Sequence, residues 1–177
     1  SSLSLIEQQL FVQHHKDLPH YNLVLSFLFG LTSSDHIPLF FEYLQLSTNP
    51  SSLKLLIHCL NESNNPPNDI PSIDNLISLN LYFCDIELEN ETSFCFYIIE
   101  KHQNNTFKWL GNKYPNIIQY SKNIGNTKDV NMFLYSSLQG SLTILKWLYK
   151  KSNNIITKFD SNNATSLYFA SQGGYIE

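Results

Sequence analysis

The last fifty residues contain an internal repeat, which restricts the possible folds more than any other feature. NMFLYSSLQGSLT (131–143) aligns without gaps with TSLYFASQGGYIE (165–177). The alignment pairs Phe133 with Leu167, Ser136 with Ala170, Gly140 with Gly174 and Leu142 with Ile176. A repeat of this kind is one supersecondary unit that buries its apolar face against the neighbouring unit. We therefore expect this part of the chain to consist of stacked helical hairpins.

Two motifs within the repeat resemble ankyrin repeats, whose period of ~33 residues is close to the offset between the two copies. TSLYFA (165–170) stands where ankyrin repeats have T-P-L-H-x-A, and ILKWL (144–148) stands where they have a second helix of the type I-V-K-x-L. Ser166 replaces the usual Pro and Tyr168 the usual His, and the first copy lacks this start altogether. The resemblance covers residues 127–177 and implies one divergent repeat and one truncated repeat. We expect the array to continue beyond this fragment.

The residue types at the helix ends agree with this interpretation. Thr165 is a suitable N-cap for a first helix. Gly140 and Gly174 can each end such a helix in a left-handed turn. Leu142, Leu145 and Leu148 are expected to face the neighbouring repeat.

The first ninety residues also have helical periodicity. LSLIEQQLFVQHH places Leu3, Ile6, Leu10 and Phe11 on one face, and YNLVLSFLFGL is apolar nearly all round, as in a buried helix. LFFEYLQL and a segment starting near Pro50 are further helices. NNPPNDIP is expected to be a linker, and SIDNLISLNLYFC resumes the helical pattern.

Residues 5–88 resemble the helical region that follows the nucleotide-binding core of STAND-class NTPases with a NACHT domain. The matching positions are Tyr21, Phe27, Gly30, Leu31, Phe40, Phe41, His58, Cys59, Leu60 and Glu62. The resemblance implies a regulatory region that joins an ATPase switch to a sensing repeat array. This chain has no phosphate-binding G-x-x-x-x-G-K-[ST] motif, so a nucleotide is expected only through a region outside it.

The middle of the chain has a weaker pattern. SFCFYIIEKH is compatible with a helix or a strand, and we favour a helix because its surroundings are helical. TFKWLGNKYP and NIIQYSKNIG are predicted to be short helices that end at Gly or Pro. The sequence thus predicts an all-α chain: a helical bundle over 1–88, a helical linker or divergent repeat over 89–126, and an ankyrin-type solenoid over 127–177.

The composition argues against several classes of partner and location. The net charge is −4, and all eleven basic residues are Lys, whereas nucleic-acid-binding surfaces favour Arg. No apolar run approaches the ~20 residues of a membrane span. Cys59, Cys84 and Cys95 are odd in number and lie in apolar contexts, as reduced thiols do. We expect a cytoplasmic protein without nucleic-acid or membrane partners.

No catalytic or metal site is predicted. His14, His15 and His20 cluster without metal-ligand spacing. His58 and Cys59 are adjacent on a helix and point about 100° apart, so core packing is the better interpretation. The alternating Asp85, Glu87 and Glu89 would share one side of an extended segment, which favours a solvated linker over a cation site.

The expected function is protein–protein interaction within a larger signalling or sensor protein, with no cofactor. Ankyrin arrays bind partners through hairpin tips and first helices, so the resemblance makes Tyr135, Tyr168 and Gln172 the candidate partner contacts. Two alternatives stay open: a stand-alone ankyrin adaptor without an NTPase, and a small Cys/His hydrolase in the first ninety residues.

Overall fold

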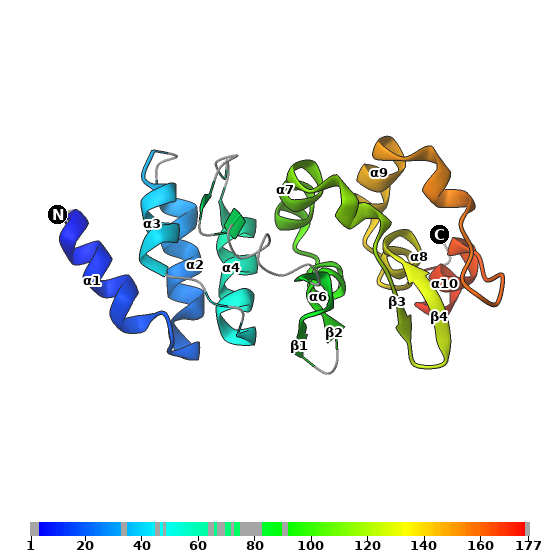
Figure 1. Ribbon diagram of the computed structural model, residues 1–177, viewed down its shortest axis with the longest axis horizontal. Helices are drawn as coiled ribbons and strands as arrows, with labels where there is room; N and C mark the ends of the chain where they lie inside the picture. Colours follow the sequence, from blue (N-terminus) through cyan, green and yellow to red (C-terminus); the bar gives the residue numbers. More distant parts are fainter. Residues whose placement is uncertain are drawn as a thin grey trace. The chain divides into compact units, whose positions relative to one another are not determined.

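The computed structural model of the chain is mainly helical, and its described residues divide into two compact units (Figure 1). The structure describes residues 4–32, 35–44, 47, 49–63, 66, 70, 71, 73, 74, 83–89 and 92–175. The first unit spans Ser1–Phe94 and the second spans Cys95–Glu177. The expected helical class is confirmed, but the all-α prediction missed two short antiparallel hairpins among the described residues.

The first unit contains a run of short helices followed by a hairpin. They are α1 (Leu5–His15), η1 (Pro19–Tyr21), α2 (Asn22–Leu31), α3 (Ile37–Leu44), α4 (Pro50–Glu62), η2 (Phe83–Asp85), β1 (Glu87–Glu89) and β2 (Thr92–Ser93). Most of the predicted helix in SIDNLISLNLYFC lies outside the described residues.

Local side-chain chemistry sets the start of two of these helices. Ser4 and Glu7 form a reciprocal capping box on α1, which satisfies two backbone N–H groups. Asn49 caps α4 by accepting a 2.8 Å hydrogen bond from the Ser52 amide. Pro50 occupies the first turn of α4, where its missing N–H costs nothing.

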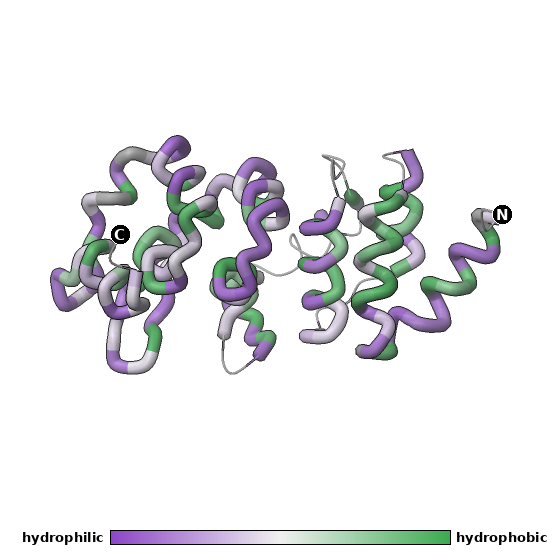
Figure 2. Tube along the Cα trace, turned by 180° about the vertical axis from the view of Figure 1, so that it is seen from behind, coloured by the Kyte–Doolittle hydropathy of each residue, from purple (hydrophilic) through white to green (hydrophobic). Residues whose placement is uncertain are grey.

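Aromatic side chains form the centre of the first unit's core. Phe29 of α2 lies 5.1 Å from Phe40 and 4.9 Å from Phe41 of α3, measured between ring centroids. α2 also packs against α4, and α1 packs against α3. Colouring by hydropathy shows long hydrophobic stretches in α2 and α3, whereas α1 alternates between hydrophilic and hydrophobic turns (Figure 2).

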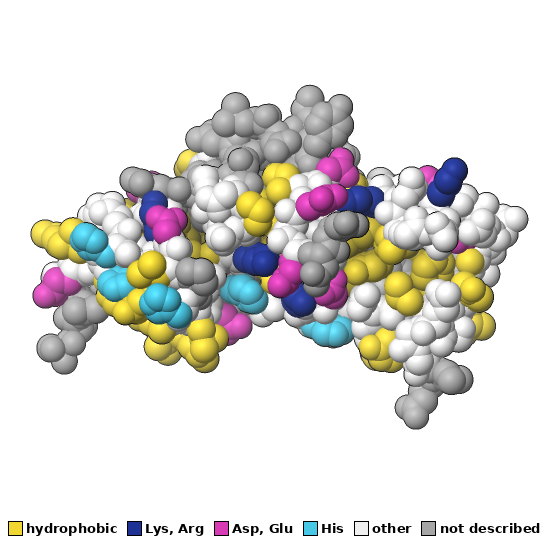
Figure 3. All heavy atoms as spheres, turned by 90° about the horizontal axis from the view of Figure 1, so that it is seen from below, with side chains coloured by type: hydrophobic (Ala, Val, Ile, Leu, Met, Phe, Trp, Pro, Cys, Tyr) yellow, Lys and Arg dark blue, Asp and Glu magenta, His cyan; other side chains and the backbone are white. Residues whose placement is uncertain are grey.

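The predicted buried faces of α1 and α2 are wrong. Ile6 is 70% exposed and Leu10 is 49% exposed, and Leu3 of the predicted face lies outside the described residues. Val12 of α1, which was not placed on that face, is buried. In α2, Leu25 and Phe29 are buried, but the apolar residues on the other side are exposed. Those are Leu23, Val24, Phe27 and Leu31. Hydrophobic and His side chains gather on one surface of this unit (Figure 3).

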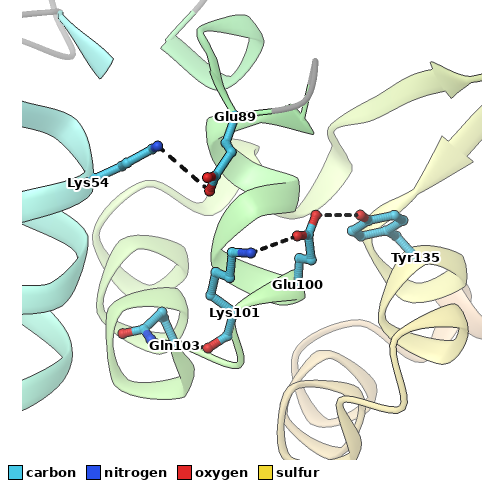
Figure 4. A network of polar contacts seen from close by, with 6 residues as sticks. All are labelled: Lys54, Glu89, Glu100, Lys101, Gln103 and Tyr135. Atoms are coloured by element: carbon cyan, nitrogen blue, oxygen red, sulfur yellow. Dashed lines mark hydrogen bonds and ion pairs between the residues drawn. The ribbon is translucent and has the colours of Figure 1, made fainter. Parts of the chain in front are cut away.

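The acidic segment after residue 84 is a paired strand rather than a linker. β1 runs antiparallel to β2, and it exposes Glu87 and Glu89 while burying Leu88. The predicted alternation of carboxylate and apolar side chains on opposite sides of the segment is therefore correct for residues 87–89. Glu89 forms an ion pair with Lys54 of α4, with 3.6 Å between Nζ and Oε2 (Figure 4).

The second unit contains helical hairpins and one further β-hairpin. Its elements are α6 (Phe94–Glu100), α7 (Asn104–Lys113), η3 (Pro115–Gln119), β3 (Ser121–Ile124), β4 (Thr127–Asn131), α8 (Met132–Leu138), α9 (Leu142–Lys151), η4 (Asn153–Thr157) and α10 (Ser166–Gln172). The predicted helices at SFCFYIIEKH and TFKWLGNKYP are confirmed as α6 and α7.

The predicted helix at NIIQYSKNIG is wrong. Its first part is the 3₁₀ helix η3, and its second part is strand β3, which pairs with β4. Gly125 has φ +54° in the turn between them, a left-handed conformation that favours a tight hairpin. Pairing with β4 explains why this segment is extended.

A constant shift along the chain relates the first two helical hairpins of this unit. The elements α6, α7 and η3 have the same lengths and the same spacing as α8, α9 and η4. Residues 94–119 therefore align without gaps with residues 132–157. We call this relation the α6/α8 correspondence. The Gln103 amide bonds to the Ile98 carbonyl, and the Ser141 amide bonds in the same way to the Ser136 carbonyl. The sequence carries the relation too, in Lys-Trp-Leu at 108–110 and 146–148.

The predicted repeat relates α8 to α10, and we call this relation the α8/α10 correspondence. Asn131 and Thr165 are the equivalent N-caps, and Gly140 (φ +61°) and Gly174 (φ +81°) are the equivalent left-handed residues. The cap at Thr165 and both glycine turns are therefore confirmed. The two correspondences make three aromatic residues equivalent, and all three are buried. They are Tyr97, Tyr135 and Phe169.

Contacts between successive hairpins hold the second unit together. α8 packs against α9 and α10, and α7 packs against α9. Phe96 stacks on Tyr135 with 4.3 Å between ring centroids. Leu148 is buried as expected, but Leu142 is 58% exposed, so only part of the predicted Leu face is covered.

Candidate protein-interaction site

Two of the three predicted contact residues lie together on α10. Tyr168 and Gln172 are one helical turn apart, and both are exposed. The Gln172 Nε2 donates a 3.4 Å hydrogen bond to the Tyr168 hydroxyl. Thr165 fixes the start of this helix by accepting a 3.3 Å bond from the Tyr168 amide. The two side chains therefore present an aromatic ring and an amide on one short, capped helix.

These two residues line a cleft of about 460 Å³ between α10, the loop before it and the end of the β3–β4 hairpin. The lining residues are mostly polar. They are Thr127, Asp160, Asn162, Asn163, Ala164, Thr165, Tyr168, Phe169 and Gln172. Hydroxyl and amide groups of this kind both donate and accept hydrogen bonds, so the cleft suits a polar peptide backbone or side chain.

Asp160 organises the loop that forms one wall of the cleft. Its side chain is buried, and its Oδ1 accepts bonds of 3.0 Å from the Asn162 amide and 2.6 Å from the Ala164 amide. Asn163 has φ +59° in this turn, a conformation that Asn tolerates better than most residues. The Ser161 amide donates a 3.1 Å bond to the Lys128 carbonyl, which ties the loop to strand β4.

Tyr135 is placed differently from the other two predicted contacts. It is 6% exposed, its ring stacks on Phe96, and its hydroxyl donates a 3.4 Å bond to Glu100 (Figure 4). Burial raises the pKa of Tyr135 to about 12, and the nearby Glu100 charge acts in the same direction. The structure therefore does not bring Tyr135 into the cleft.

Tyr168 is more exposed than the residues at the equivalent position in the earlier hairpins. Leu134 and Phe96 occupy that position and are 0% and 2% exposed, whereas Tyr168 is 53% exposed. An exposed tyrosine offers a large apolar ring with a polar tip, which is a common combination at protein interfaces.

Sequence reasoning missed the loop residues that form the wall of the cleft. Asp160, Ser161 and Asn162 read D-S-N, a composition typical of a turn in which Asp accepts backbone hydrogen bonds. That signal was present in the sequence. Thr127 had no such signal, because it reaches the cleft only through the β3–β4 pairing.

The His and Cys candidates lie outside this cleft. Cys59 is fully buried in α4, and burial raises the pKa of its thiol well above the usual value. That disfavours the thiolate, which is the nucleophilic form. Desolvation lowers the pKa of the neighbouring His58. The His15 ring stacks on Phe11, and its Nδ1 is hydrogen-bonded at 2.7 Å to the Phe11 carbonyl oxygen.

Within the part of the chain that the structure describes, no three His, Cys, Asp or Glu side chains gather as a metal site requires. No described helix combines the length and the hydrophobicity needed to cross a bilayer. Comparisons with protein-family models, with curated proteins and with solved structures found no match to this chain.

Proposed function

We propose that this chain is a protein–protein interaction module in which ankyrin-type helical hairpins form a solenoid. The exposed Tyr168–Gln172 pair, at the edge of a cleft with a fixed polar wall, is the observation that carries the proposal. The partner is another protein, which supplies an exposed peptide segment to this cleft.

Rigidity of the site supports the proposal. Asp160 holds the loop before α10, Thr165 caps the helix, and the Ser161 amide bonds to strand β4. A preorganised surface loses little conformational entropy on binding. Tyr is also among the residue types enriched at the energetic centres of protein interfaces.

The resemblance of residues 5–88 to the region after a NACHT domain supports a place in a larger signalling or sensor protein. In that arrangement the repeat array senses a partner, and a nucleotide acts only through a region outside this chain. The stand-alone adaptor is the second candidate, and it uses the same binding face.

A selection experiment tests the proposed site. Peptides are selected from a random display library against the immobilised chain, and the binding of enriched peptides is measured by fluorescence anisotropy. Tyr168→Ala and Gln172→Ala are each expected to weaken binding at least fivefold, as truncation of an important interface residue does. Lys146→Ala, at an exposed position of α9, is the matched control and should leave binding unchanged.

If the enriched peptides bind the Tyr168→Ala and Gln172→Ala variants as tightly as the parent chain, the cleft is not the partner site. Circular dichroism of each variant checks that the helices remain folded, which is expected because both side chains are exposed.

A further inference from the structure

The cleft beside α10 carries a negative charge that no residue of its lining balances. Among the described residues that line it, Asp160 is charged and all the others are neutral. This charge restricts which chemical group a partner can place in the cleft.

The two carboxylate oxygens of Asp160 have different surroundings. Oδ1 accepts the hydrogen bonds of the Asn162 and Ala164 amides, whereas Oδ2 makes no hydrogen bond or ion pair in the described part of the chain. Asp160 is only 6% exposed, and removing an unpaired carboxylate from water is costly. Oδ2 is not among the unpaired side-chain atoms that the described structure seals from solvent, so a ligand in the cleft can reach it.

The lysines nearest to Asp160 along the sequence lie outside the lining of the cleft. The Lys158 Nζ donates a 2.9 Å hydrogen bond to the Gln119 Oε1. Lys128 meets the loop through its backbone, since its carbonyl accepts the Ser161 amide. A positive group that balances Asp160 is therefore expected to come from a ligand.

The cleft is poorly suited to an anion or to a metal ion. Two backbone amides beside it already have acceptors, because Ala164 donates to Asp160 and Tyr168 donates to the Thr165 hydroxyl. Calcium and magnesium need several oxygen ligands, and the described lining offers one carboxylate. An aromatic ring such as that of Tyr168 attracts an organic cation over its face.

We propose that this cleft binds the guanidinium group of an arginine side chain that the partner protein supplies, with Asp160 Oδ2 as its acceptor and the Tyr168 ring against its face. The assignment to a partner rests on the proposed function. A guanidinium presents five N–H donors and can stack on a ring while it pairs with a carboxylate. The Thr127 hydroxyl and the side-chain oxygens of Asn162 and Asn163, which also line the cleft, are the further acceptors.

Titration of the parent chain with two small probes tests the proposal. Nα-acetylarginine amide carries the guanidinium, and Nα-acetylcitrulline amide has nearly the same shape without the charge. Binding is followed by NMR at the Asn162 and Ala164 amides, which bond to the Asp160 carboxylate. The arginine probe is expected to shift both signals to saturation and to bind about tenfold or more tightly than the citrulline probe. Equal binding of the two probes overturns the proposal.

Two further additions distinguish the competing cations. Nα-acetyllysine amide is expected to bind more weakly than the arginine probe, because an ammonium lacks the planar fork of donors. A lysine probe that binds as tightly as the arginine probe overturns the choice of a guanidinium. Calcium chloride alone is expected to leave both signals in place. Calcium that shifts them and displaces the arginine probe assigns the cleft to a metal ion and overturns the proposal.

A matched pair of variants locates the charge. Asp160→Asn keeps an oxygen for the loop amides but removes the charge, so it should abolish the preference for the arginine probe over the citrulline probe. Asp129→Asn removes an exposed carboxylate of β4 that lies outside the cleft, and it should keep the preference. Circular dichroism checks the fold of both variants, and the comparison of probes on the parent chain decides if Asp160→Asn does not fold. A preference that survives in Asp160→Asn, or that Asp129→Asn also abolishes, overturns the proposal.

The peptides selected on the immobilised chain separate this inference from the proposed function. They are expected to contain arginine, and its replacement by citrulline should weaken binding to the parent chain about tenfold or more but leave binding to Asp160→Asn unchanged. Peptides that need Tyr168 and Gln172 but bind equally well with citrulline leave the partner site standing and overturn the guanidinium inference. Peptides that need neither residue refute the proposed partner site, whereas the small probes decide separately whether the cleft binds a guanidinium.

Discussion

The indole ring of Trp147 lies directly over Gly111, so that a methyl group on Gly111 would collide with it. The same ring meets Phe107 edge-on at 5.7 Å. Together these contacts join α7 to α9, two helices that the α6/α8 correspondence makes equivalent. Close approach of the helices therefore depends on the absence of a side chain at Gly111.

Gly111→Ala is expected to destabilise the second unit by about 1–3 kcal/mol, the usual cost of forcing extra atoms into a packed core. Alanine has the higher helix propensity, so a gain in stability would show that the Trp147 ring is not seated there. Chemical denaturation followed by circular dichroism measures the change. Asn112→Ala, at the next and exposed position, is the control and should be neutral or slightly stabilising.

Gly140→Ala tests the turn that ends α8. Gly140 has φ +61°, and a Cβ there would meet the ring of Tyr175. Gly125 has a similar φ of +54° but open space around it. Gly125→Ala should therefore cost only the left-handed strain of about 1 kcal/mol, and Gly140→Ala should cost clearly more. Equal losses in denaturation would mean that Tyr175 does not pack on this turn.

Asp160 provides a prediction for the wall of the partner cleft. Asp160→Ala removes the acceptor for the Asn162 and Ala164 amides, and it is expected to cost about 1–3 kcal/mol because hydrogen bonds to a charged acceptor are lost. Asp160→Asn keeps one side-chain oxygen and should cost less. Amide hydrogen exchange at Ala164 reports the loss directly. Unchanged exchange in Asp160→Ala would contradict the hydrogen bonding described here.

The buried Tyr135 predicts a specific alkaline behaviour. Its pKa is raised to about 12 in the folded chain, against an ordinary value of ~10 in the unfolded chain. Below pH ~10 both states keep the proton, so Tyr135 adds no pH dependence to stability. Between pH ~10 and ~12 only the unfolded state loses the proton, so stability falls as the pH rises.

Tyr135→Phe should remove this part of the loss of folding stability at alkaline pH. The measurement is the difference in tyrosinate absorbance between the parent chain and Tyr135→Phe during a pH titration. A difference curve with a midpoint near the raised pKa of about 12 agrees with the buried ring. A midpoint near the ordinary value of ~10 would place Tyr135 at the surface, as a partner contact requires.

Features set by neighbouring residues could be predicted from the sequence. Thr165 caps α10, and Gly140 and Gly174 form left-handed turns, because cap and turn chemistry acts within one helical turn. Tyr168 and Gln172 were candidate contacts because of the resemblance to the first helix of an ankyrin repeat, and the structure exposes both side chains on α10.

Features set by distant contacts were missed. Periodicity identified apolar residues in α1 and α2 but not which of them a neighbouring helix covers, so Ile6 and Phe27 were wrongly assigned to buried faces. Strand β3 was assigned as helix because only its pairing with β4 makes it extended. Tyr135 was predicted to contact a partner, yet Phe96, far away in sequence, covers its ring.

The repeat that underlies the α6/α8 correspondence was visible in the sequence but was not recognised. Lys108-Trp109-Leu110 aligns with Lys146-Trp147-Leu148, and the same shift aligns Asn116-Ile117-Ile118 with Asn154-Ile155-Ile156. This shift is longer than the one that separates α8 from α10. An uneven period of this kind hides a repeat from a search at one fixed offset.

Backbone NMR assignment of the chain in solution tests the central claim, that the second unit consists of equivalent helical hairpins. We expect helical chemical shifts over 94–100, 132–138 and 166–172, and positive φ at His102, Gly140 and Gly174. Extended chemical shifts with cross-strand contacts in α8, α9 and α10 would contradict it.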